Sequence, residues 1–448
     1  MEEYLEKLLT QIRCKKARPF VEEELRGHME DQISDYMAAG MDRSHAEESA
    51  VKDMGDPVEA GISLDRVHRP QAAWGLIFLI AMISLAAVVL HRLMGMELKN
   101  LSGSRFPITD MNFTADVLVG IGVMLFICFI DYTTISRYAK FIAAAILGLC
   151  FTAGIYGVQI CGITYYIKNV RISIFALMMF YVPVYGAVLY QYRHMGYRGF
   201  ARAVLWMALP VFGAFRLPNL MLSAVLLVSM LVQLTIAVAK GWFCVSKKKV
   251  IAGLWFAGAG FPVFSLVFSY MFSFMAEYQQ ERIRAFLTNS QDANHITSVL
   301  RSLTESGKLV GRGTKEVIGV IPGLNSDYIF TYLTASYGML AGVFVLCILA
   351  AVIFMVFGVS VRQKNQLGMV MGCGCGMVFL LNTVIHVMEN MGWLPLMSQT
   401  FLPFFSAGGS CLVMSYGLIG IILSIYRYKN VYPNHVKITP AKKKMPVE

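Results

Sequence analysis

Long apolar runs constrain this chain more than any other feature of its sequence. A helix needs about 20 residues to cross the hydrocarbon core of a bilayer, and after residue 70 the chain repeatedly offers apolar segments of roughly that length. These segments are 73–94, 113–131, 138–161, 171–192, 201–217, 219–240, 250–276, 328–358, 366–390 and 402–426. Hydrophobic residues make up 56% of the 448 residues, and charged residues only 15%. The sequence therefore predicts an all-α, polytopic membrane protein of about ten transmembrane helices.

The formal net charge of +11 comes from Lys and Arg residues that are spread over short loops. Nucleic-acid-binding domains gather such residues on one face, so the pattern argues against a nucleic-acid partner. Basic residues in short loops mark the cytoplasmic side, and here they concentrate in alternate loops and in the C-terminal tail. This asymmetry predicts that both termini are cytoplasmic and that the large loop 277–327 is extracytoplasmic. The basic tail, residues 431–448, suits contact with anionic membrane lipids.

The first 70 residues differ from the rest, because they are charged and contain no long apolar run. Apolar residues recur at helical spacing over 4–12 and again over 21–36. Gly40 ends the second pattern, and the Gly-Asp-Pro sequence at 55–57 separates a third helical segment from a short fourth one. Residues 1–70 are therefore predicted to form a small cytosolic helical domain ahead of the membrane region.

A polar triplet stands where the large loop meets the eighth apolar run: Asn325, Ser326 and Asp327. A carboxylate at a membrane boundary has its pKa raised by desolvation, which suits a general base. The same residues allow a second interpretation, in which Ser326 caps the following helix and Asp327 complements the helix dipole. Taken by themselves, the residues favour the capping interpretation.

Further ionisable residues lie inside or at the ends of the apolar runs, where such residues are candidates for function. Asp131 ends the second run close to Arg137, and we expect these two to form an ion pair. His386 and Glu389 share a helix face in the ninth run, and we expect an interfacial pair rather than a metal site. No metal site is assigned from the sequence.

Several motifs follow one another in a fixed order after residue 277. They read YQQERIRAFL at 278–287, SGKLVGRG at 306–313, NSDYIF at 325–330 and LPFFSAGGS at 402–410. These motifs are similar to Y-Q-x-x-R-I-x-x-F-L, S-G-G-L-x-G-x-G, H-T-D-F-I-F and L-P-F-I-S-Y-G-G-S of the SEDS family (FtsW, RodA and SpoVE). With the predicted span layout, residues 73–430 resemble this family of ten-span bacterial proteins of cell shape, elongation, division and sporulation.

The resemblance implies a peptidoglycan glycosyltransferase in the bacterial plasma membrane. Its substrate would be lipid II, an undecaprenyl-diphosphate-linked disaccharide-peptide, and its partner a class B penicillin-binding protein that cross-links the product. The resemblance places Asp327 on the acid regarded as catalytic in the family. The expected substrate contacts are Arg282, Arg312, Lys315, Asn219 and Ser410, of which the three basic residues suit the diphosphate. Help from a divalent cation, Mg²⁺ or Mn²⁺, stays open.

The chain also departs from the family pattern. At 217–221 it reads LPNLM where the family has Q-P-D-x-G, so Asn219 replaces an intramembrane carboxylate. Two other functions therefore stay open: a non-catalytic scaffold or regulator of a wall-synthesis complex, and a flippase for the lipid-linked precursor. Residues 1–70 resemble HAAS-type prefix domains through the MGDP sequence at 54–57, which implies a regulatory or interaction module.

Overall fold

The computed structural model describes most of the chain as helix. The described residues are 1–101, 110–160, 163–167, 173–217, 219–271, 277, 280, 295–311, 323–394 and 400–435. Within them, eight helices are long and apolar enough to cross a membrane. These are α5 (Trp74–Leu101), α6 (Asp110–Phe129), α8 (Ala139–Tyr156), α9 (Ile174–Gln191), α11 (Leu220–Ala239), α16 (Met339–Val361), α17 (Gln366–Asn390) and α18 (Gly409–Arg427). The predicted all-α, polytopic membrane fold is confirmed.

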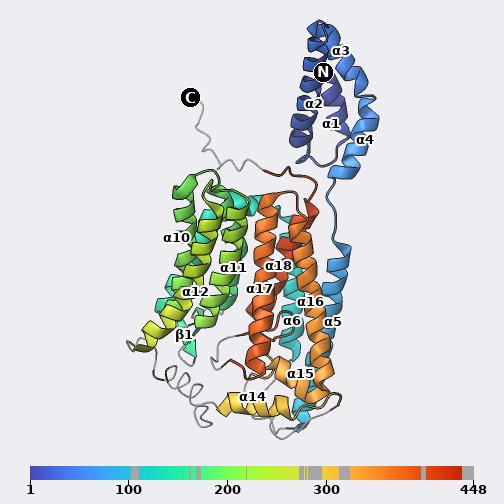
Figure 1. Ribbon diagram of the computed structural model, residues 1–448. Coiled ribbons are helices and arrows are strands. Elements are labelled where there is room, and N and C mark those ends of the chain that lie inside the picture. The colour runs from blue at the N-terminus through green and yellow to red at the C-terminus, as the bar shows by residue number, and fades with distance from the viewer. Residues whose placement is uncertain are drawn as a thin grey trace, which may run out of the picture.

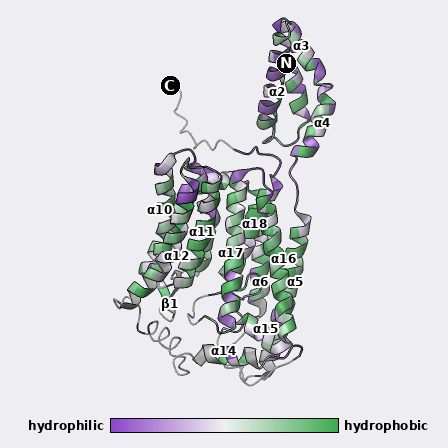
Figure 2. Ribbon diagram, viewed as in Figure 1, coloured by the Kyte–Doolittle hydropathy of each residue, from purple (hydrophilic) through white to green (hydrophobic). Residues whose placement is uncertain are grey.

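The other two predicted spans also form helices of the same bundle. They are α10 (Gly196–Arg216) and α12 (Lys247–Met271), which both contact α11 and lie to its left in Figure 1. Pro210 lies inside α10, which continues past it to Arg216. Figure 2 shows hydrophobic residues along the helices of the bundle and hydrophilic residues over the N-terminal helices.

The two ends of the bundle differ. Two short helices, α14 (His295–Glu305) and α15 (Ile329–Tyr337), lie at the end far from the N-terminal helices, which we call the α15 end (Figure 1). A two-stranded antiparallel ribbon of β1 (Gly157–Ile160) and β2 (Ile163–Ile167) follows α8. The sequence did not predict this ribbon, because its residues continue the apolar run of α8 without a break in hydropathy.

The predicted single span 328–358 is wrong, because the chain breaks at Gly338 into α15 and α16. Gly338 has φ +99°, a conformation that side-chain-bearing residues rarely adopt. A Cβ there would also lie 2.8 Å from the carbonyl oxygen of Leu309. The backbone N–H groups of Met339 and Leu340 donate to the carbonyls of Lys308 and Leu309 at 3.0 and 3.2 Å. The segment 308–311 therefore forms hydrogen bonds with both helices at the break.

Close packing of α6 against α18 depends on small residues, as in many membrane helix pairs. A Cβ at Gly120 would lie 2.3 Å from the Tyr416 ring, and one at Gly420 would lie 2.8 Å from the carbonyl oxygen of Met124. The Tyr416 hydroxyl in turn forms a 2.6 Å hydrogen bond with Ser84 of α5. The glycines thus allow the backbones to approach each other, and the tyrosine ties a third helix to the pair.

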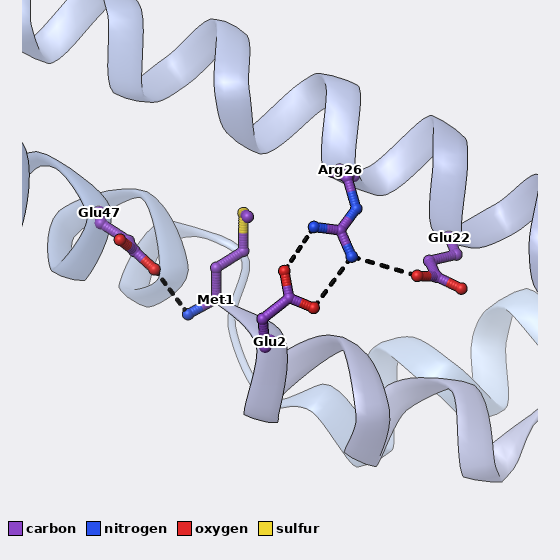
Figure 3. A network of polar contacts seen from close by, with 5 residues as sticks. All are labelled: Met1, Glu2, Glu22, Arg26 and Glu47. Carbon is purple, nitrogen blue, oxygen red and sulfur yellow. Dashed lines mark hydrogen bonds and ion pairs between the residues drawn. The ribbon is translucent and has the colours of Figure 1, made fainter.

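The N-terminal unit consists of α1 (Glu2–Gln11), α2 (Arg18–Ala38), α3 (Arg43–Asp53) and α4 (Pro57–His68), in agreement with the predicted helical segments. Polar contacts tie its start together (Figure 3). The terminal amino group of Met1 pairs with Glu47 at 3.0 Å, and Arg26 contacts both Glu2 and Glu22. These contacts join α1 to α2 and α3.

Among the described residues, the ion pair between Lys16 and Asp131 connects the N-terminal unit to the bundle. Lys16 Nζ lies 2.7 Å from Asp131 Oδ2, and the Asp131 side chain is only 4% exposed. Asp131 also accepts a hydrogen bond from the Tyr432 hydroxyl and caps α7 (Tyr132–Arg137) through the Thr133 N–H at 2.9 Å. The predicted pair of Asp131 with Arg137 is wrong, because Asp131 is paired with a residue far away in sequence.

We expect Gly120→Ala to destabilise the protein by about 1–3 kcal/mol, because the added methyl group overlaps the Tyr416 ring. Gly122→Ala is the matched control on the same helix, since a Cβ there meets nothing within 4 Å. Thermal unfolding in detergent measures both variants. Equal melting temperatures for the two variants would contradict the close α6–α18 packing.

We expect Lys16→Met to loosen the N-terminal unit from the bundle, because it leaves the nearly buried Asp131 without its cation. The rate of amide hydrogen exchange in the connecting residues 68–73 should rise about fivefold, because the ion pair contributes about 1 kcal/mol to the contact between the unit and the bundle. Lys15→Met removes the neighbouring exposed charge and serves as the control. Unchanged exchange in the Lys16 variant would show that the ion pair does not hold the unit in place.

Candidate functional site

Asp327 lies in a tight turn at the α15 end of the bundle. The N–H groups of Ser326 and Tyr328 donate to the Gly323 carbonyl at 3.0 and 3.2 Å. Tyr328 occupies the N-cap position of α15, and no side chain caps this helix. The Ser326 hydroxyl donates back to Gly323 instead, at 3.3 Å. The capping interpretation is therefore wrong, and Asp327 lies before the helix.

A buried amide holds this turn in place. Asn390, at the end of α17 and 1% exposed, donates from Nδ2 to the Asp327 carbonyl at 3.0 Å. Its Oδ1 accepts from the backbone N–H of Thr331 at 3.0 Å and from the Thr331 hydroxyl at 2.9 Å. One amide thus joins the Asp327 turn, α15 and α17. The sequence signal for this role is a polar residue that closes a long apolar helix.

The LPFFSAGGS motif packs against the same turn from the other side. Ala407 N–H donates to the Asn325 carbonyl at 2.7 Å, and the Ser406 hydroxyl donates to the Ser326 carbonyl at 2.7 Å. Phe404 adopts φ +67°, which is strained for a bulky residue, and stacks on Phe379 at 5.7 Å. Two motifs that are far apart in the sequence therefore form one site.

The Asp327 carboxylate is available for proton transfer. Its side chain forms no hydrogen bond or ion pair with any residue that the structure describes, while its backbone is held as above. Burial raises the pKa of Asp327 to about 7. Because this pKa is near neutrality, the carboxylate and carboxylic acid forms are both populated at physiological pH.

Of the other predicted site residues, only Ser410 lies in a described cavity. The cavity has a volume of about 550 Å³ and lies between α6, α9 and the first turns of α18. Ser410 Oγ accepts a hydrogen bond from the Ser173 N–H at 3.3 Å. The residues that line the cavity are Asp116, Ala176, Leu177, Phe180, Gly409, Ser410, Val413 and Met414.

Asn219 has a structural role in the fold. It is 3% exposed, and its Oδ1 accepts from the Leu222 N–H at 3.0 Å, which caps α11. This use of the side chain does not bring it to Asp327. Arg282, Arg312 and Lys315 lie outside the described residues.

The predicted pair of His386 with Glu389 is wrong. Glu389 accepts from the Thr400 hydroxyl at 2.7 Å, and neither ring nitrogen of the fully buried His386 has a hydrogen-bond partner among the described residues. Among the residues that the structure describes, no group of three or more His, Cys, Asp or Glu side chains could hold a metal ion. The described residues around Asp327 thus do not form a ligand set for Mg²⁺ or Mn²⁺, and no step is derived through a metal.

Comparison with known proteins shows the family to which this helical bundle belongs. The sequence model of the family described as "Cell cycle protein" (FtsW, RodA and SpoVE) matches residues 72–431. The probable peptidoglycan glycosyltransferase FtsW of Enterococcus hirae is 34% identical over 124 residues, which cover 27% of this chain and 31% of that protein. The peptidoglycan glycosyltransferase MrdB of Escherichia coli K12 is 24% identical over 167 residues, 36% of this chain and 45% of that protein. These alignments span less than half of each relative's length.

Solved structures share the fold. A chain from a structure described as "Structural coordination of polymerization and crosslinking by a peptidoglycan synthase complex" superposes with a TM-score of 0.62 at 18% identity, over 80% of this chain and 98% of that one. The rod shape determining protein RodA of Thermus thermophilus superposes with a TM-score of 0.56 at 16% identity, over 80% and 97%. The family model covers most of the chain, including the whole helical bundle, and the chain therefore belongs to the FtsW, RodA and SpoVE family of cell cycle proteins.

Proposed function

We propose that this protein is a peptidoglycan glycosyltransferase that polymerises lipid II, with Asp327 as its general base. The observation that carries the proposal is a half-buried carboxylate without a hydrogen-bond partner among the described residues, at the entrance to an apolar bundle. Its pKa of about 7 suits proton abstraction at neutral pH. The names of the relatives in Enterococcus hirae and Escherichia coli support the reaction class.

In the proposed reaction, the carboxylate of Asp327 takes the proton of the 4-hydroxyl of one lipid-linked sugar. The hydroxyl oxygen then forms a bond to the anomeric carbon of the second lipid II molecule. The bond from that carbon to the diphosphate oxygen breaks, and undecaprenyl diphosphate leaves with the electron pair. Arg282, Arg312 and Lys315 are proposed to contact this diphosphate, because guanidinium and ammonium groups stabilise its negative charge.

The proposal includes a location and a partner. The four N-terminal helices and the end of α18 lie at one end of the bundle, and the Asp327 turn lies at the other (Figure 1). We place the former in the cytoplasm of a bacterium and the latter outside the plasma membrane, as the distribution of Lys and Arg indicates. A class B penicillin-binding protein is the proposed partner, supported by the likeness to a chain from a peptidoglycan synthase complex.

A non-catalytic scaffold is the second candidate function. Asn219 stands where the family pattern has a carboxylate, and it serves as a helix cap. A chain that lacks this acid could keep the fold and the binding of partners without turnover. Catalysis by the purified protein separates the two functions.

We expect purified wild-type protein, reconstituted with lipid II and a cognate class B penicillin-binding protein, to produce glycan chains. Asp327→Asn should lower the rate by about 10²–10⁴-fold, because the amide cannot take up the proton. Glu277→Gln is the control, since it replaces an exposed carboxylate by an amide. Wild-type protein that makes no polymer would favour the scaffold, and transport of lipid II without polymer would indicate a flippase.

The rate should also depend on pH through Asp327. Since burial raises the pKa of this group to about 7, the active carboxylate form increases as the pH rises through about 7. We expect kcat/KM to fall about tenfold per pH unit well below this value and to level off above it. Initial rates between about pH 5 and pH 9 test this. A rate that stays level over this whole range would mean instead that the carboxylate titrates near its ordinary value of about 4 and is solvated during catalysis.

A further inference from the structure

A second carboxylate, that of Asp116, lies next to Gly409 of the segment 406–410. Asp116 belongs to the early part of the α6 membrane span Asn112–Phe129 and lines the cavity next to Ser410. It is half-buried and forms no hydrogen bond or ion pair with the residues that the structure describes. Carboxylates inside a membrane span are costly and usually face a partner or a ligand. Its position in a cavity points to a ligand.

The walls of this cavity and its polar end differ in chemistry. Leu177 and Phe180 of α9 and Val413 and Met414 of α18 form an apolar lining, while Asp116 and Ser410 supply oxygen atoms. A carboxylate only accepts hydrogen bonds, so the ligand group beside it must donate them. A diphosphate is therefore unsuitable at this position, because it is anionic. A sugar ring is suitable, since its hydroxyl groups donate and its C–H face packs on apolar and aromatic side chains.

The cavity is connected to the Asp327 turn through the backbone. Ser406 and Ala407 form hydrogen bonds with the carbonyls of Ser326 and Asn325 at 2.7 Å each. Two residues later in the same segment, Gly409 lines the cavity, where a Cβ would lie 2.9 Å from Asp116 Oδ2. A group bound at Asp116 thus contacts the segment that supports the proposed base. The cavity volume of about 550 Å³ is within the range of small-ligand sites.

We propose that the Asp116 cavity is a saccharide-binding subsite, in which the Asp116 carboxylate accepts hydrogen bonds from hydroxyl groups of the lipid-linked sugar. This inference rests on the proposed function, because that function supplies the lipid-linked saccharide. Asp116 acts here as a specificity-determining residue. It selects the sugar part of the substrate rather than the diphosphate or the lipid chain.

Direct binding to the full-length protein in nanodiscs tests the subsite without requiring turnover. Lipid II and undecaprenyl diphosphate are the two probes, since only the first carries the sugar. Asp116→Ala should weaken lipid II binding by about ten- to a hundredfold, as loss of a charge-assisted hydrogen bond implies, and leave undecaprenyl diphosphate binding unchanged. Thermal unfolding of each variant verifies that the fold is intact.

A glycine pair offers a matched steric test. Gly409→Ala should weaken lipid II binding in the same direction, because its Cβ displaces the Asp116 carboxylate while the charge remains. Gly408→Ala should bind like the wild type, because its Cβ would make only ordinary contact with Cys411 at 3.6 Å.

Three outcomes would overturn the inference. If neither Asp116→Ala nor Gly409→Ala changes the affinity for lipid II, the cavity is not a binding subsite for it. If Asp116→Ala weakens the binding of lipid II and of undecaprenyl diphosphate equally, Asp116 contacts the lipid or the diphosphate part of the substrate. Phosphatidylethanolamine in the nanodisc serves as a third probe, and loss of its binding alone in Asp116→Ala would assign the carboxylate to an ammonium headgroup. A different result is that the wild type makes no polymer while Asp116→Ala weakens the binding of lipid II but not of undecaprenyl diphosphate. That result would contradict the proposed function and support the subsite.

Discussion

The contact between α6 and α18 supports both ends of this molecule. Gly120 and Gly420 let the two backbones approach, because any side chain there would overlap Tyr416 or the Met124 carbonyl. At one end of this helix pair, the Ser424 hydroxyl donates to the Ile130 carbonyl at 2.6 Å, beside the Lys16–Asp131 ion pair. At the other end, Asp116 packs against Gly409. The N-terminal unit and the cavity are thus attached to opposite ends of the same two helices.

The candidate site combines a fixed backbone with a free side chain. Asn390 and Ser406 hold the carbonyl groups of the Asp327 turn from two different segments. The carboxylate itself has no hydrogen-bond partner among the described residues, and burial raises its pKa. A catalytic base benefits from this combination, because its position costs no reorganisation and its proton affinity matches the working pH.

Sequence reasoning proposed Asp327 and Ser410 as site residues, and both roles stay predictions, while several partners were assigned incorrectly. Local spacing predicted ion pairs of Asp131 with Arg137 and of His386 with Glu389. In the structure Asp131 pairs with Lys16, and the His386 ring has no hydrogen-bond partner among the described residues. Asp116 was not selected at all, because one acid at the start of an apolar run is an ordinary boundary residue until a cavity is seen beside it. Asn219 resembled a site residue by alignment of a motif, but its side chain caps a helix.

The sequence alone predicts that the chain forms a helical membrane bundle preceded by a charged helical unit. The reason is that a bilayer offers no water to the backbone, so apolar runs of sufficient length must form helices there. It also determined that Asp327 stands at a membrane boundary. The tertiary structure was needed to show that Ser326 does not cap α15, that Asp327 precedes this helix, and that Asn390 and the 406–410 segment hold the Asp327 turn. Such contacts join residues far apart in the chain, and local patterns of hydropathy carry no information about them.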